Sequence, residues 1–116
     1  MITLISYGFK FGKPDCNFCF DVSYLRNPWR EEALKHAERK KVIEFVMTQP
    51  EFQQVVNAVL STIITYYTLW PEENMIIAIC CNAGADRSPI VVDAISKKLG
   101  ERDIPHEVKH PFVRMA

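Results

Sequence analysis

The residues with the clearest chemical pattern are a cysteine, an arginine and a serine close together in the chain. The stretch reads Cys81-Asn82-Ala83-Gly84-Ala85-Asp86-Arg87-Ser88. Five residues separate Cys81 from Arg87, a spacing that lets a tight loop direct successive backbone N–H groups at one phosphate dianion. A guanidinium binds two phosphate oxygens with its planar fork, which a lysine ammonium cannot do equally well. The sequence therefore predicts a phosphate site in this loop.

The segments on either side of the loop have the patterns of elements that position an anion site. Residues 75–80 form an apolar run without polar alternation, which predicts a buried strand. Apolar residues recur at helical spacing after Pro89, and proline suits the first helical position because its missing N–H would be unpaired there. The positive end of that helix dipole favours an anion, which Ser88 can also bind as a donor. Gly84 allows close backbone approach or a positive φ.

The same positive field favours a thiolate at Cys81, so catalysis by this residue is an alternative hypothesis. The stretch resembles the protein tyrosine phosphatase signature, in the variant of bacterial phosphatases with Ala-Gly-x-Asp-Arg in the loop. Those enzymes usually carry histidine before the cysteine, where this chain has Cys80. They also need an acid that protonates the leaving group, and Asp21 is the candidate. This alternative is a cysteine-dependent phosphatase that acts on a phosphomonoester.

The composition is that of a globular chain with no overall attraction to polyanions. Its 116 residues include 14 basic and 14 acidic side chains, so the formal net charge is zero. This length fits one domain over residues 1–116. The chain has neither a long apolar run nor the pattern of a signal peptide, which favours a cytoplasmic location without membrane contact. The basic residues between 35 and 41 predict a solvated helix face more than a nucleic-acid site.

The rest of the chain predicts a single three-layer α/β domain, with a mainly parallel or mixed sheet and helices on both faces. Strands are expected at residues 2–9, 16–22, 75–81 and 106–110, and helices at residues 31–47, 50–70 and 89–99. Sites in such folds lie at the carboxyl ends of the strands. The loop after the first strand, which contains Lys10, is therefore expected beside the phosphate site.

The cysteines do not predict a metal site. Cys16 and Cys19 have the C-x-x-C spacing of zinc ligands, which suggests a site completed by Cys80 and Cys81. Adjacent residues on a strand point to opposite faces of a sheet, so the second pair cannot readily bind one metal ion. Reduced thiols are expected instead. Neither a metal nor a cofactor is expected.

Nearly the whole chain resembles the C-terminal domain of the RapZ-type RNase adaptor family. The motifs that carry the resemblance occur in one order: Tyr7 to Pro14, Phe20-Asp21-Val22, Leu25 with Asn27-Pro28, Leu69-Trp70 and Cys81 to Ser88. The resemblance implies a fold similar to a sugar-phosphate-binding subdomain of phosphofructokinase, a domain that senses glucosamine-6-phosphate and binds small RNA, and a homo-oligomer. No Walker-type motif is present, so the sequence predicts a stand-alone version without the N-terminal P-loop ATPase half.

Carried over by position, the resemblance implicates the loop in phosphate binding, with Asn82 where the family has threonine. Ala85 and Asp86 replace the family's Lys-His, and Trp29 replaces a histidine linked to the ligand. The predicted ligand-binding residues are Cys81, Asn82, Ala83, Gly84, Ala85, Asp86, Arg87, Ser88, Lys10 and Asn27. The leading hypothesis is a non-catalytic module that binds a phosphorylated small molecule, such as a sugar phosphate, and has an RNA or protein adaptor role.

Overall fold

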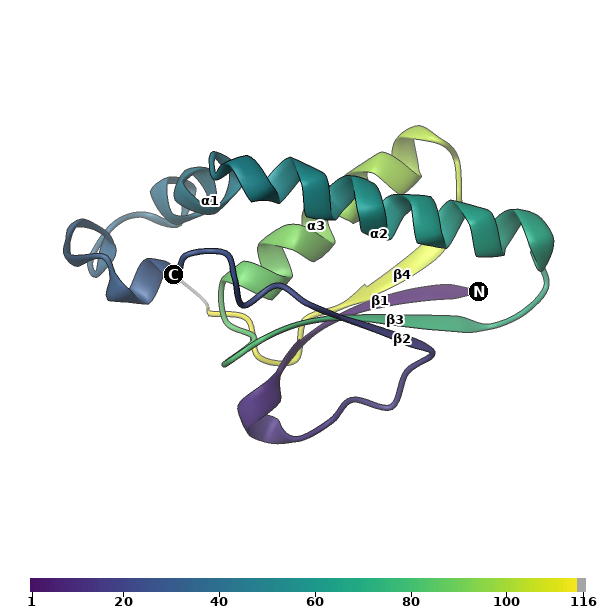
Figure 1. Cartoon of the computed structure of the whole chain (residues 1–116), viewed down its shortest axis with the longest axis horizontal. Coiled ribbons are helices and arrows are strands. Elements are labelled where there is room, and N and C mark those ends of the chain that lie inside the picture. The colour runs from purple at the N-terminus through teal and green to yellow at the C-terminus, as the bar shows by residue number, and fades with distance from the viewer. Residues whose placement is uncertain (115–116) are drawn as a thin grey trace.

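A parallel β-sheet forms the framework of the computed structural model, which describes residues 1–114 (Figure 1). Its strands are β1 (Ile2–Gly8), β2 (Phe18–Asp21), β3 (Met75–Cys81) and β4 (His106–Lys109), in the spatial order β2-β3-β1-β4. Strands β1 and β3 pair over their whole lengths, which places Gly8 opposite Cys81. The carboxyl ends of the two central strands therefore meet at one edge, where the 82–86 loop begins.

Helices α1 (Arg39–Met47), α2 (Pro50–Leu69) and α3 (Arg87–Glu101) lie on one face of this sheet (Figure 1). On β1, the residues that face the helices are buried, whereas the alternate residues are half-buried. The core is built from apolar side chains of the sheet and the helices: Ile2, Leu4, Ile77, Ile79, Val46, Val56, Val59, Ile63, Val91, Ile95 and Leu99. Within the described residues, every helix is too short or too polar to cross a membrane.

Non-helical chain packs against part of the other face of the sheet, at the carboxyl end of β1. Phe112 stacks on Phe11 with ring centroids 3.9 Å apart, and it meets Tyr7 edge-on at 5.1 Å. Phe11 belongs to a single 3₁₀ turn, η1 (Phe9–Phe11), in a segment whose glycine and proline oppose a longer helix. The α/β class and the parallel sheet are confirmed. Aromatic residues from two loops pack against part of the face on which further helices were expected.

The helix predicted at residues 31–47 begins later, at Arg39. The residues before it form two 3₁₀ turns, η2 (Pro28–Arg30) and η3 (Glu32–Leu34). Burial explains the difference, because α1 buries Val42 and Val46 whereas no residue from 31 to 38 is fully buried. Without tertiary packing, a short helix is only marginally stable in water. The other predicted elements are present in the predicted order, with bounds that differ by at most two residues.

Candidate functional site

Two glycines bring the loops after β1 and β3 into backbone contact. A Cβ atom on Gly8 would lie 2.4 Å from the carbonyl carbon of Ala83. Gly84 has a φ of 69°, and a Cβ there would lie 2.7 Å from the backbone nitrogen of Gly8. The backbone N–H of Lys10 donates to the carbonyl of Asn82 at 3.0 Å. The predicted positive φ of Gly84 is thus present, and its close backbone contact is with β1.

A cavity of about 330 Å³ opens at this contact. Its lining comprises Lys10, Asn27, Trp29, Cys81, Asn82, Ala83, Ala85, Asp86, Arg87 and Arg114. Gly84 and Ser88 belong to the predicted ligand-binding set but do not line this cavity. Ser88 is buried, and its hydroxyl lies 3.3 Å from the Tyr7 carbonyl and 3.4 Å from the Cys81 sulfur. These contacts fix the start of α3 against the two central strands.

The loop that lines the cavity has backbone N–H groups to offer a ligand. Within residues 1–114, the N–H groups of residues 83–86 donate to no backbone acceptor. Helix α3 follows directly, and the side chain of its N-cap residue, Asp86, makes no capping hydrogen bond. Unpaired N–H groups at a helix N-terminus carry partial positive charge and bind anions. The arrangement therefore has the donors that the predicted phosphate loop requires.

Asp86 is a buried carboxylate held between two arginines from distant parts of the chain. Its side chain is about 5% exposed and forms ion pairs with Arg39 of α1 and Arg114 of the C-terminal segment. The Arg114 Nε atom lies 3.0 Å from Asp86 Oδ1, and the Arg114 backbone N–H donates to the Ala85 carbonyl at 2.9 Å. Burial lowers the pKa of Arg39, and burial together with the Arg39 charge lowers the pKa of Arg114. Both guanidinium groups remain charged at neutral pH.

The C-terminal segment that carries Arg114 is fixed by His110. The His110 Nδ1 atom lies 2.7 Å from the Ser6 hydroxyl, and its Nε2 atom lies 2.7 Å from the Asp93 carboxylate. These contacts join the end of β4 to β1 and α3. The Arg114 guanidinium then lies 4.7 Å from the ring centroid of Trp29, whose side chain is 56% exposed. One exposed aromatic ring and one arginine thus form a wall of the cavity.

The side chain of Arg87 acts within the protein in a way that the sequence did not predict. Its Nη1 atom donates to the carbonyls of Ser23 and Leu25 at 2.7 and 3.0 Å. A guanidinium that holds two backbone carbonyls has fewer N–H groups left for a phosphate. Arg87 lines the cavity, so its role as the main phosphate clamp stays a prediction, and its Nη1 atom also positions the segment from β2 to Asn27.

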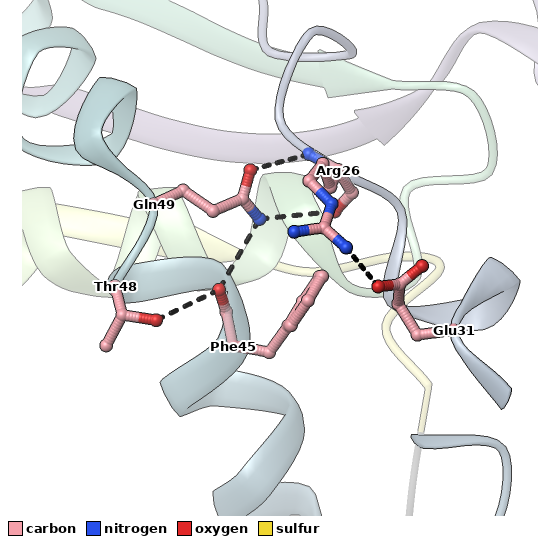
Figure 2. Close-up of polar contacts among 5 residues, drawn as sticks. All are labelled: Arg26, Glu31, Phe45, Thr48 and Gln49. Carbon is pink, nitrogen blue, oxygen red and sulfur yellow. Dashed lines mark hydrogen bonds and ion pairs between the residues drawn. The ribbon is translucent and has the colours of Figure 1, made fainter. Parts of the chain in front are cut away.

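A second set of contacts holds the same segment from the helical side (Figure 2). The Arg26 backbone N–H donates to the Gln49 side chain at 2.7 Å, and the Gln49 amide donates to the carbonyls of Arg26 and Phe45 at 3.4 Å. The Arg26 guanidinium lies 4.9 Å from the Phe45 ring centroid and forms an ion pair with Glu31. Gln49 therefore connects the junction of α1 and α2 to the residue next to Asn27, which lines the cavity.

Replacing Gln49 with alanine is expected to lower the free energy of unfolding by about 1 kcal/mol, because hydrogen bonds to three backbone groups are lost together. Urea denaturation followed by circular dichroism measures the change. Gln53→Ala is the matched control, because Gln53 lies in the first turns of α2, which follows Gln49, and within residues 1–114 its side chain bonds only to the exposed Asn57. Equal stability of the two variants would show that the Gln49 contacts do not hold the segment.

The two residues assigned to the phosphatase alternative do not line the same cavity, because Cys81 belongs to its lining and Asp21 does not. Asp21 is exposed, accepts a hydrogen bond from the Ser23 backbone N–H at 2.8 Å and does not line the cavity. Among the described lining residues, Asp86 is the one carboxylate, and it is engaged by ion pairs with Arg39 and Arg114. No other carboxyl group of the described lining is placed to protonate a leaving group. The structure gives the phosphatase alternative no support, and Asp21 stabilises its own turn.

Arg39 and Arg114 are site residues that the sequence reasoning missed. Arg39 belongs to a basic run, which is typical of a solvated helix face, and nothing local distinguishes the residue that points inward. Arg114 is remote in sequence from every motif. The predicted set also lacks Trp29, which departs from the family pattern and lines the cavity. The signal that could have found the two arginines is Asp86 itself, because a buried carboxylate requires cationic partners.

Comparisons with known proteins agree with this architecture. Residues 1–114 match the family described as the RapZ C-terminal domain. A nucleotide-binding protein of Alkaliphilus oremlandii is 36% identical over 108 residues, which cover 88% of this chain and 37% of the relative. A second, from Heliobacterium modesticaldum, is 30% identical over 115 residues, which cover 94% of this chain and 38% of that relative. A third, from Nocardioides sp., is 37% identical over 106 residues, which cover 86% of this chain and 35% of that relative. The chain thus spans less than two fifths of the length of these relatives. It belongs to the RapZ C-terminal domain family.

Proposed function

We propose that the cavity binds a phosphorylated small molecule, such as a sugar phosphate, without transforming it. The observation that carries the proposal is the group of N–H donors in the 83–86 loop and at the start of α3, for which the described chain supplies no backbone acceptor or side-chain cap. Lys10 and Arg114 add positive charge to the same cavity. Together these groups suit a phosphate dianion.

The cavity also fits a ligand larger than inorganic phosphate. Its volume of about 330 Å³ leaves space beside the anion, and the exposed ring of Trp29 lines that space. Aromatic faces pack against the apolar faces of sugar rings and against nucleobases. The curated relatives are named nucleotide-binding proteins, so a nucleoside monophosphate belongs among the ligands to be tried. The phosphate group is what the candidate ligands share.

Calorimetric titration with matched ligands tests the proposal. Glucose-6-phosphate, glucosamine-6-phosphate and AMP are compared with glucose, which has no phosphate. We expect heat of binding from at least one phosphorylated ligand and none from glucose. If no phosphorylated compound, including inorganic phosphate, binds to the folded protein at millimolar concentration, the proposal is wrong.

Lys10→Ala is expected to weaken binding of the phosphorylated ligand by about five- to tenfold, because it removes one partly screened positive charge from the cavity. The Lys10 side chain is exposed and its backbone bond to Asn82 remains, so the fold is retained. Lys13→Ala is the control, since it removes the same charge from the same segment outside the cavity. Equal loss of affinity in both variants would point to a general charge effect.

An adaptor role toward RNA or protein and a homo-oligomeric state are further proposals that rest on the family. The basic run contributes Lys35, Lys40 and Lys41 to the surface, whereas Arg39 is paired with Asp86. An RNA complex held by these lysines would weaken steeply as salt is raised. Filter binding at two salt concentrations and analytical ultracentrifugation measure the two properties. Absent or salt-independent RNA retention would contradict the RNA role.

A further inference from the structure

Three of the four cysteines lie near one another on the sheet face opposite the helices. The Cys19 sulfur on β2 lies 3.2 Å from the Cys80 sulfur on β3. Cys16 precedes β2, and its pKa is raised first by burial and then by the Cys19 thiol. Cys81 is on the other face of β3, within the core. Among residues 1–114, no three histidine, cysteine or acidic side chains are grouped as metal ligands.

The sheet holds the Cys19 and Cys80 thiols in contact. Cys19 pairs with Ala78 and Asp21 pairs with Cys80, so the two cysteines are diagonal neighbours on adjacent parallel strands. The main chain continues this pairing beyond β2, because the Val22 N–H donates to the Cys80 carbonyl at 2.8 Å. Cys19 is exposed to solvent and Cys80 is fully buried. The pair therefore combines an accessible thiol with a protected one behind it.

We propose that Cys19 and Cys80 are a site of reversible oxidative modification, at which a peroxide converts the two thiols to a disulfide. The site is separate from the cavity and does not depend on the proposed ligand. Both thiols are reduced in this structure. Their sulfurs need to approach by about 1 Å to reach the disulfide bond length of about 2.05 Å. The edge position of β2 allows that movement, because β2 pairs on one side only.

The reaction proceeds in two steps that balance. The Cys19 sulfur, which solvent reaches, attacks one oxygen of hydrogen peroxide, the O–O bond breaks, and Cys19 becomes a sulfenic acid as one water leaves. Burial, followed by the hydrogen bond to Cys19, raises the pKa of Cys80, which explains why the buried thiol is not the first to react. The Cys80 sulfur then attacks the Cys19 sulfur, and the S–O bond breaks. The hydroxide takes the Cys80 proton and leaves as a second water, so two electrons pass from sulfur to peroxide.

The disulfide would join the two strands that position the site. Strand β2 continues into the segment whose carbonyls hold Arg87, and β3 continues into the 82–86 loop. A cross-link between residues 19 and 80 closes a long loop of the unfolded chain and so stabilises the folded state. We expect the midpoint of thermal unfolding to rise by roughly 5–10 °C on oxidation and to return when the disulfide is reduced.

Mass spectrometry of the peroxide-treated full chain tests the proposal. After free thiols are blocked, trypsin yields one peptide with Cys16 and Cys19, residues 11–26, and one with Cys80 and Cys81, residues 42–87. We expect these peptides to be linked in the wild type and in Cys16→Ser, with a mass two hydrogens below their sum, and to separate on reduction. In Cys19→Ser, the link and the rise in thermal midpoint should both disappear.

Cys80→Ala distinguishes Cys80 from Cys81 as the partner of Cys19. We expect this variant to lose the link as well. A disulfide within peptide 11–26, a link that persists in Cys19→Ser, or a Cys19 that is oxidised to sulfinic acid without a link would each overturn the proposal. Because Cys19 is exposed, Cys19→Ser is expected to fold normally, which keeps the test valid if the buried Cys80 position does not tolerate alanine.

Discussion

Replacing Gly84 with alanine is expected to lower the free energy of unfolding by about 3 kcal/mol or more. The residue has a φ of 69°, which L-residues adopt at a cost of roughly 1–2 kcal/mol. Its Cβ would lie 2.7 Å from the Gly8 nitrogen and the Tyr7 carbonyl carbon, where backbone cannot move without distorting β1. Overpacking of this kind costs roughly 1–3 kcal/mol in addition. Urea denaturation monitored by circular dichroism measures the total.

Gly100→Ala is the matched control for Gly84→Ala. Gly100 lies in the last turn of α3, and a Cβ there would meet no atom within 4 Å. Alanine at such a helical position stabilises by roughly 0.5–1 kcal/mol. Replacement by alanine is thus expected to lower the free energy of unfolding at Gly84 and to raise it at Gly100. If Gly84→Ala were as stable as the wild type, the result would contradict the close contact between the two loops. It would also contradict the described shape of the cavity that these loops form.

Asp86→Asn is expected to raise the affinity for a phosphorylated ligand about tenfold, which corresponds to about 1.4 kcal/mol. The Asp86 carboxylate lines the cavity and would repel a phosphate dianion, and it also offsets part of the positive charge of its two arginine partners, which could attract one. The same change should destabilise the protein, because a buried ion-pair partner is lost. On this prediction, Asp86 would stabilise the fold at the expense of affinity for the proposed ligand.

Titration calorimetry and urea denaturation of the same protein samples measure both effects of Asp86→Asn. Asp103→Asn is the control, since it removes the same charge just beyond the far end of α3, at a φ of 55° that asparagine tolerates. It should change neither property appreciably. Unchanged or weaker phosphate affinity in folded Asp86→Asn would show that this carboxylate does not oppose the anion. That result would not decide whether the cavity binds phosphate, which the titration of the wild-type protein tests separately.

Local patterns were sufficient to predict most of the fold. The apolar run of β3, the helical spacing of α3 and the proline at the start of α2 each act through neighbours in sequence, and each element is present. The helix predicted before Arg39 was wrong in its first half, because charges at helical spacing cannot form a helix that lacks a buried side. Helix length there depends on contacts with the core, which a local pattern does not contain.

The chemistry of the site was predicted only in part, for a comparable reason. The loop spacing and its glycine located the cavity, and Lys10 and Asn27 line it as expected. The second role of Arg87 was not predicted, because its guanidinium meets two carbonyls that belong to a loop more than sixty residues earlier. Partners at that separation are brought together by the order of the strands.

By itself, the sequence determined the α/β class, the family and the place of the 82–86 loop between β3 and α3, since each follows from local residue patterns or from motifs in a fixed order. Tertiary structure alone decided what each charged group of the loop contacts. It paired Asp86 with Arg39 and Arg114, turned Arg87 toward backbone carbonyls and placed the Cys19 and Cys80 sulfurs in contact. The physical reason is that Coulomb forces, hydrogen bonds and thiol chemistry act over a few ångströms in space, regardless of distance along the chain.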